Sequence, residues 1–166
     1  MLEFLTAKPV LIGLHLGFAI IGIDGFLWLL GELSAMRTGG SANPDGGWAS
    51  SKRKLWAAGI GTVGFILSWL IGGYYYVKFY GTLVKPVILK GLAPWAHAVV
   101  METKEHVFLF LVPMAVTAFF IAMLDQETFE RLQLKRIAMW LVALIAVIGL
   151  TIGLMGFIIS AAARFG

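Results

Sequence analysis

The sequence contains no cysteine and few charged residues. Of its 166 residues, 13% are Asp, Glu, Lys or Arg and 60% are hydrophobic. Without cysteine, the chain can form neither disulfides nor iron–sulfur clusters, and thiol chemistry is excluded. A mean hydropathy of +0.89 lies outside the range of soluble globular domains. The composition therefore predicts an integral membrane protein.

Several functional motifs are also missing. The turn-rich stretch 34–51 contains Gly, Asn, Pro and Asp but lacks the Lys-Ser/Thr ending of a phosphate-binding loop. No nucleophile–base pair or oxyanion device can be placed, so the sequence supports at most a redox subunit and no other enzyme activity. The basic residues flank apolar segments instead of clustering with exposed aromatics, which argues against a nucleic-acid surface.

Four helices are predicted to cross the membrane, over residues 10–31, 55–77, 94–124 and 137–163. A helix needs about 20 residues to span the apolar core of a bilayer, and each of these ranges is long enough. We therefore expect residues 1–166 to form a single all-α transmembrane domain, a four-helix up-down bundle.

Lys and Arg side chains predict the orientation of the bundle. One side of the membrane would hold Arg37, Lys52, Arg53, Lys54, Arg131, Lys135 and Arg136, and the other Lys8, Lys78, Lys85, Lys90 and Arg164, with Lys104 left aside. The positive-inside rule then places both termini outside, in an inner membrane of a bacterium or archaeon. We expect residues 52–54 to anchor the second helix among the headgroups, with Trp48 at the interface.

The second helix ends in an aromatic stretch. Tyr74, Tyr75 and Tyr76, with Tyr80 beyond them, are typical of the aromatic belt at the headgroup level. Residues 81–94 are polar and interrupted by prolines, so we expect a short lid on the outer surface.

The first helix carries two ionisable residues on opposite faces. His15 and Asp24 are nine residues apart, which corresponds to 900° around a helix at 100° per residue. Gly13 and Gly17, near the Asp24 side, predict a seam for close helix packing, and Gly22 leaves room beside the His15 imidazole. Because lipid accommodates neither polar face cheaply, we expect a second interface, to another copy of the chain or to a partner membrane subunit.

Asp24 falls at the same depth as Thr62 and Thr117. We expect it to be a buried proton relay, or a helix contact satisfied by a threonine hydroxyl.

The stretch 97–106 contains the residues most indicative of chemistry. On a straight helix Glu102, Glu105 and His106 share one sector, whereas His97 points the opposite way and is expected to be interfacial. Counted from the inner helix ends, His15 on the first helix and His106 on the third lie within about one turn of each other in height. The sequence therefore predicts a site between the first and third helices.

Three interpretations of that site remain open. In the first, His15 and His106 are the axial ligands of a haem b, and the protein is an electron-transfer subunit of a respiratory-type assembly. In the second, His15, Glu102, Glu105 and His106 bind a divalent metal such as Zn, Fe or Mn. In the third, these side chains are structural, and the chain is a non-catalytic interaction subunit.

Overall fold

A computed structural model of the chain describes residues 6–36 and 44–165, with side chains described from residue 52 onward in the second range. These residues form helices and no strand. Four of the helices are long and apolar enough to cross a membrane: Lys8–Ala35, Lys52–Lys90, Ala96–Met123 and Lys135–Phe165. The all-α prediction with four such helices is confirmed, whereas the expected position of the Trp48 side chain lies outside the described residues.

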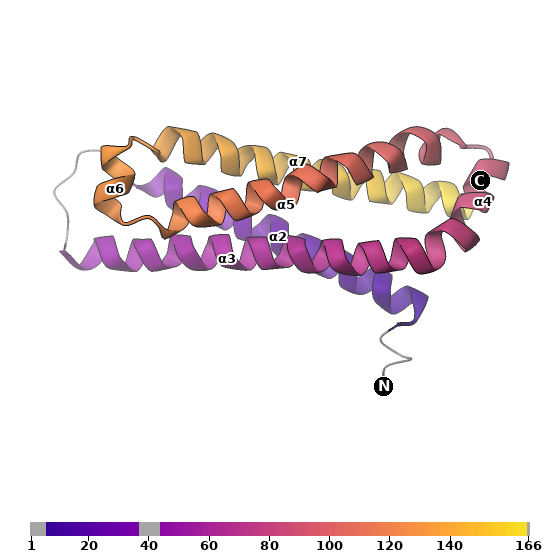
Figure 1. Ribbon diagram of the computed structural model, residues 1–166, viewed down its shortest axis with the longest axis horizontal. Coiled ribbons are helices and arrows are strands. Elements are labelled where there is room, and N and C mark those ends of the chain that lie inside the picture. Colours follow the sequence, from indigo (N-terminus) through magenta and orange to yellow (C-terminus); the bar gives the residue numbers. More distant parts are fainter. Residues whose placement is uncertain (1–5, 37–43, 166) are drawn as a thin grey trace.

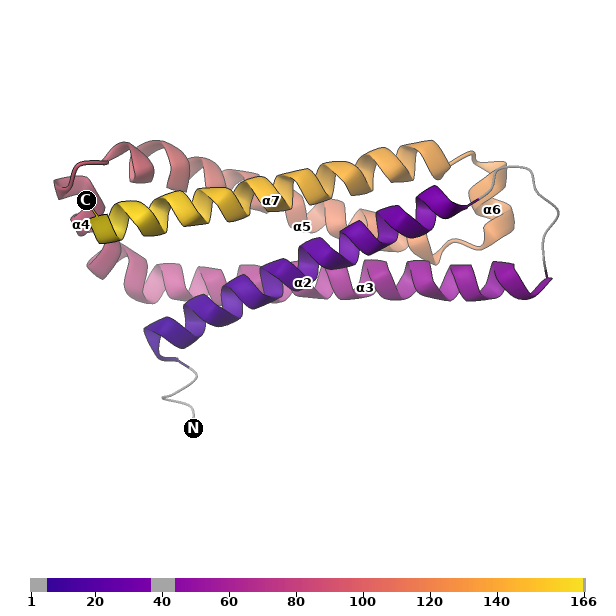
Figure 2. The same cartoon turned by 180° about the vertical axis from the view of Figure 1, so that it is seen from behind.

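The four long helices form a bundle in which each packs against two others. α2 (Lys8–Ala35) and α5 (Glu102–Met123) both contact α3 (Pro44–Tyr75) and α7 (Lys135–Phe165). α2 and α5 consequently stand diagonally across the bundle, as the opposite views in Figures 1 and 2 show. The first and third long helices are therefore separated by the interior of the bundle.

Glycines bring α2 and α3 into backbone contact. A Cβ added to Gly25 would lie 2.5 Å from the Cα of Gly61, and one on Gly64 would lie 2.6 Å from the backbone nitrogen of Gly22. Gly13 and Gly17, the predicted seam, are exposed and would meet nothing within 4 Å. Within the chain the predicted seam is wrong, because α3 covers the Gly22 and Gly25 side of α2 instead.

Phe65 fills the space that the sequence assigned to a bulky group near His15. A Cβ on Gly22 would lie 2.5 Å from Cδ1 of this ring, and one on Gly149 would lie 3.1 Å from its Cζ. Phe65 also stacks on Phe26, with ring centroids 5.6 Å apart. The room beside Gly22 is thus part of the packed core, which corrects that expectation.

The segment that follows α3 in the chain is more helical than predicted. α3 continues without a break into a π-helix, η1 (Tyr76–Val84), and then into α4 (Lys85–Lys90). Pro86 stands in the first turn of α4, at the junction with η1. The expected lid is therefore helical up to residue 90. A second π-helix, η2 (Ala96–Met101), precedes α5.

The opposite end of the bundle is closed by α6 (Gln126–Arg131), a short helix between α5 and α7 that the sequence reading missed (Figure 1). Its six residues are too few to give a helical hydrophobic period. The Asp125 side chain caps α6 by accepting a hydrogen bond from the Thr128 backbone N–H, at 2.8 Å.

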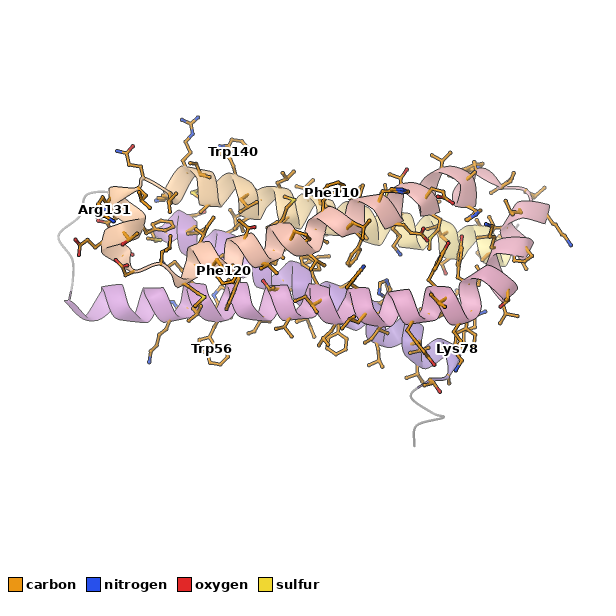
Figure 3. All side chains as sticks on the ribbon, viewed as in Figure 1. Trp56, Lys78, Phe110, Phe120, Arg131 and Trp140 are labelled. Carbon is orange, nitrogen blue, oxygen red and sulfur yellow. The ribbon has the colours of Figure 1, made fainter. Side chains whose placement is uncertain are left out.

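Large apolar side chains cover the exterior between the two ends. Trp56, Phe110, Phe120 and Trp140 are each more than half exposed and project outward in Figure 3. A continuous apolar exterior of this kind is typical of a surface that faces lipid.

Candidate functional site

His15 is fixed between α2 and α3. Its Nδ1 lies 2.9 Å from the backbone oxygen of Ser68 and 3.0 Å from the Ser68 Oγ. The serine hydroxyl donates to the His15 backbone oxygen, at 3.0 Å. Because the Ser68 carbonyl can only accept, Nδ1 carries the proton, and a neutral His15 keeps its lone pair on Nε2.

His106 lies elsewhere. It is exposed, and its Nδ1 donates to the backbone oxygen of Glu102 on its own helix, at 2.6 Å. Lys104, about 200° away around α5, faces the interior and lies within electrostatic range of His15. The structure therefore does not bring His15 and His106 together. Matching their heights was insufficient, because their helices are diagonal and His106 faces outward.

The predicted metal ligands are also separated. Across residues 6–36 and 44–165, no group of three or more His, Asp or Glu side chains is arranged to hold a metal ion. Glu102 is directed to His97, and Glu105 lies beside Tyr76. The four-residue metal site expected from the sequence is not assembled in the chain.

The structure instead brings together Tyr80, His97 and Glu102. The Tyr80 hydroxyl lies 3.1 Å from Nδ1 of His97, and Nε2 of the same ring lies 3.8 Å from Oε1 of Glu102. The His97 side chain is 6% exposed and that of Glu102 is 49% exposed. A surface carboxylate thus leads to a buried imidazole and a buried phenol. His97, expected to be interfacial, stands near the end of the bundle with its side chain buried against Tyr80.

Two π-helices position this hydrogen bond. Tyr80 belongs to η1 and His97 to η2, and residues four apart lie on the same side of such a helix. The Tyr76 and Tyr80 rings accordingly stack, with centroids 5.1 Å apart. The sequence reading assigned Tyr80 to an aromatic belt. Only its spacing of four from Tyr76 hinted at a shared face.

A second group of polar side chains continues into the bundle. The Tyr76 hydroxyl lies beside the carboxyl group of Glu105, which in turn lies within electrostatic range of Lys104. Oε1 of Glu105 is buried and has no hydrogen-bond partner within the described part of the chain. We call the following residues the polar cluster: His15, Ser68, Tyr76, Tyr80, His97, Glu102, Lys104 and Glu105.

Asp24 is not buried within the chain. It is exposed on the outer face of α2, so it lacks the predicted threonine partners. The Thr62 hydroxyl donates to the Ala115 carbonyl, at 3.1 Å, and the Thr117 hydroxyl donates to the Pro113 carbonyl, at 2.9 Å. The expected hydrogen bond from a threonine to a buried Asp24 is therefore wrong, because the side chain points away from the bundle.

Lys54 points into the bundle, whereas Asp24 points away from it. It is fully buried, and its Nζ has no hydrogen-bond partner among the described residues. The ammonium group lies 4.7 Å from the centroid of the Phe129 ring, beside an apolar cavity of about 10 Å³. The sequence predicted an exposed anchor, whereas the Lys54 side chain is buried against α6 at the end of the bundle. Arg53 remains exposed and pairs with Glu32, at 3.0 Å.

Comparisons of the chain with models of protein families, with curated proteins and with solved structures found no match.

Proposed function

We propose that the protein is an integral membrane subunit whose polar cluster passes protons from the surface at Glu102 to a group inside the bundle. The observation that carries this proposal is the contact series from Glu102 through His97 to Tyr80. Ionisable side chains inside membrane helices are costly and are typical of ion and proton pathways.

The imidazole of His97 suits this role because its two nitrogens face different partners. A neutral imidazole can accept a proton on one nitrogen and release one from the other without moving. Nε2 faces the carboxylate and Nδ1 faces the phenol of Tyr80. The 3.8 Å gap to Glu102 is longer than a hydrogen bond, and either a bridging water or a rotation of the half-exposed carboxylate can close it.

Beyond Tyr80 the contact to Tyr76 is a ring stacking, which carries no proton, so the relay continues only if a water molecule joins the two hydroxyls. Tyr76 stacks on Tyr80, and Glu105, with its buried unpaired oxygen, lies between Tyr76 and Lys104. An unpaired buried carboxyl oxygen is an acceptor available to a proton or a water molecule.

Exchange of the His97 ring proton with solvent, followed by NMR in lipid, tests the proposal. Replacing Glu102 with Gln should slow this exchange by about 10²-fold, the usual contribution of a positioned acid–base group. Glu127→Gln, an exposed acid at the other end of the molecule, is the matched control and should change nothing. Equal exchange rates in the Glu102→Gln variant and the parent would refute the relay.

One observation favours haem b as a second candidate. The Nδ1–H of His15 is held by a backbone carbonyl, which is the usual arrangement of a metal-ligating histidine and leaves Nε2 as the ligating atom. His106 faces outward, so it could serve only at a contact with a second chain.

An optical spectrum tests the haem candidate. Protein purified after growth with excess haem would show a Soret band, and an α-band after dithionite. His15→Ala should remove both bands, whereas His106→Ala should leave them in a monomeric preparation. A colourless parent protein under these conditions eliminates the candidate, and the exchange experiment on His97 remains independent of that outcome.

We further propose that another membrane subunit, or a second copy of the chain, covers Asp24. A carboxylate exposed to lipid at the centre of a helix costs about 2.5–3.5 kcal/mol, and Gly13 and Gly17 leave space for a neighbouring helix. Because the chain has no cysteine, Gly17→Cys should give a disulfide-linked dimer in membranes if a second copy binds there. Leu144→Cys, at an exposed position on α7, should give no disulfide-linked dimer.

A further inference from the structure

A large groove lies at the α6 end, far from the polar cluster. It has a volume of about 1030 Å³ and is bounded by the end of α2, by α6 and by the first turns of α7. Leu30 and Met36 line it from α2, and Trp140 and Ala143 line it from α7. A space of this size accommodates a headgroup together with the first carbons of acyl chains.

The groove carries unequal charges. Lys135, Arg136 and Glu130 all line it. Glu130 already accepts a hydrogen bond from Gln126, and Lys135 donates one to the Met36 carbonyl. Arg136 is exposed and forms no ion pair with any side chain that the structure describes. The lining therefore carries two basic side chains and one acidic one, and the guanidinium group of Arg136 is available.

The basic residues of the groove stand where an apolar helix begins. Lys135 and Arg136 are the first two residues of the span Lys135–Phe165. Directly after them, Ile137 is 61% exposed and Trp140 71% exposed on the outer surface of the bundle. A cation followed by outward-facing apolar and indole side chains matches the order of phosphate, glycerol and acyl chain in a phospholipid.

The turn that leads into the groove is the C-terminal cap of α6. Gln133, which lines the groove, has a φ of 52°, the left-handed conformation usual for the residue after a helix C-cap. The backbone N–H groups of Gln133 and Leu134 donate to the carbonyls of Glu130 and Phe129, at 3.0 and 3.1 Å, so this cap fixes the start of the turn between α6 and α7.

From the groove, its unpaired guanidinium and its position at the start of a span, we propose that the α6–α7 groove binds an anionic phospholipid. Arg136 contacts the phosphate, with Lys135 beside it, and the acyl chains follow the apolar side of the groove along Trp140 and Ala143. Such a site is independent of the polar cluster, and it belongs at the membrane surface that the basic residues place inside.

Native mass spectrometry of the full chain, released from detergent with graded phosphatidylglycerol, tests the site. We expect one tightly bound lipid, whose dissociation constant rises about fivefold in Arg136→Gln, the effect of losing one basic residue near a membrane surface. Arg164→Gln is the matched control, because Arg164 is an exposed cation on the same helix at its other end. Arg164→Gln should bind the lipid with the same dissociation constant as the parent protein.

Three results would overturn the site. The first is equal weakening by Arg136→Gln and Arg164→Gln, which indicates diffuse charge attraction. The second is equal retention of phosphatidylcholine, which indicates unspecific apolar contact. The third is displacement of the lipid by millimolar inorganic phosphate, which indicates a site for free phosphate. Thermal unfolding of Arg136→Gln in the absence of lipid should match that of the parent and so exclude misfolding.

Discussion

The two ends of the bundle bury ionisable side chains in different ways. At the η1 and η2 end, His97 contacts a phenol through one nitrogen and approaches a carboxylate through the other. At the α6 end, the buried Lys54 ammonium group has no hydrogen-bond partner among the described residues, but the face of Phe129 lies near it and Glu130 lies within electrostatic range. Burial of a polar group is favourable only where partners replace water, so equal burial has opposite consequences at the two ends.

The buried ionisable groups of the two ends can therefore do different things. A network of polar side chains can both hold its members and exchange protons among them. Lys54 takes part in no such hydrogen-bond network among the described residues, so our proposal for the α6 end rests on its open groove and not on its buried lysine. Substitutions at each end test this difference, and a substitution in the α2–α3 contact tests the packing that both ends share.

The largest effect is expected at the α2–α3 seam, which supports both ends. Gly25→Ala would place a methyl group 2.5 Å from the backbone of Gly61, so we expect a loss of about 3 kcal/mol of unfolding free energy. Gly13→Ala, with open space around it, is the control and should be neutral or stabilising by up to about 1 kcal/mol. Denaturant unfolding in detergent measures both, and similar values for the two variants would contradict a tight seam.

His97→Phe should destabilise the polar end. The substitution leaves the buried Tyr80 hydroxyl without its partner, which costs about 1–3 kcal/mol. The control, His106→Phe, affects an exposed ring and should stay within about 0.5 kcal/mol of the parent. If the two variants unfold at the same denaturant concentration, the hydrogen bond to Tyr80 contributes nothing to stability.

Lys54→Met should raise the free energy of unfolding, whereas His97→Phe lowers it. A methionine of similar length fills the same apolar cage without an ammonium group to desolvate, so we expect a gain of about 1–3 kcal/mol. Lys90→Met, at the exposed end of α4, is the control and should be nearly neutral. A loss of stability in Lys54→Met would show that the ammonium group is stabilised where it lies, and the contrast between the two ends would disappear.

The smallest effect is expected at Asp125, the cap of α6. Hydrogen bonds from Thr128, first of all from its backbone N–H, lower the pKa of this carboxyl group below its usual value. A lowered pKa in the folded state means that the contribution to stability is present at neutral pH and is lost as the pH falls through the acidic range. The protection factor of the Thr128 amide, the intrinsic exchange rate divided by the observed rate at the same pH, should therefore fall on acidification below about pH 4.

Asp125→Asn provides the control for the cap. Asparagine retains an oxygen acceptor for the Thr128 N–H but has no charge, so local protection should remain and its pH dependence should vanish. Unchanged pH dependence in this variant would mean that another group titrates.

The failures of the sequence reading have identifiable physical causes. Helical periodicity gives the face of a side chain but not the element that covers that face. His15 and His106 fall at equal heights, yet α2 and α5 are diagonal in the bundle. In the same way Gly13 and Gly17 looked like a packing seam, although α3 covers Gly22 and Gly25 instead.

The contact between Tyr80 and His97 could not have been predicted from spacing alone. It depends on π-helical turns and on the path of residues 85–95, which returns the chain so that residues 17 apart meet. Asp24 shows the same limit, because a carboxylate in an apolar helix points to the core or to a neighbouring subunit according to the packing of the other helices.

The sequence by itself determined the four long apolar helices, because helix length and hydropathy are local properties of consecutive residues. It also identified the side chains that can bind or transfer protons or ions, because the few ionisable residues within apolar segments can be seen in the sequence. Only the tertiary structure decided which of them meet. The order of helices around the bundle, the glycine contacts and the two π-helical turns place His97 against Tyr80 and leave Lys54 without a hydrogen-bond partner among the described residues, and these are contacts between residues distant in the chain.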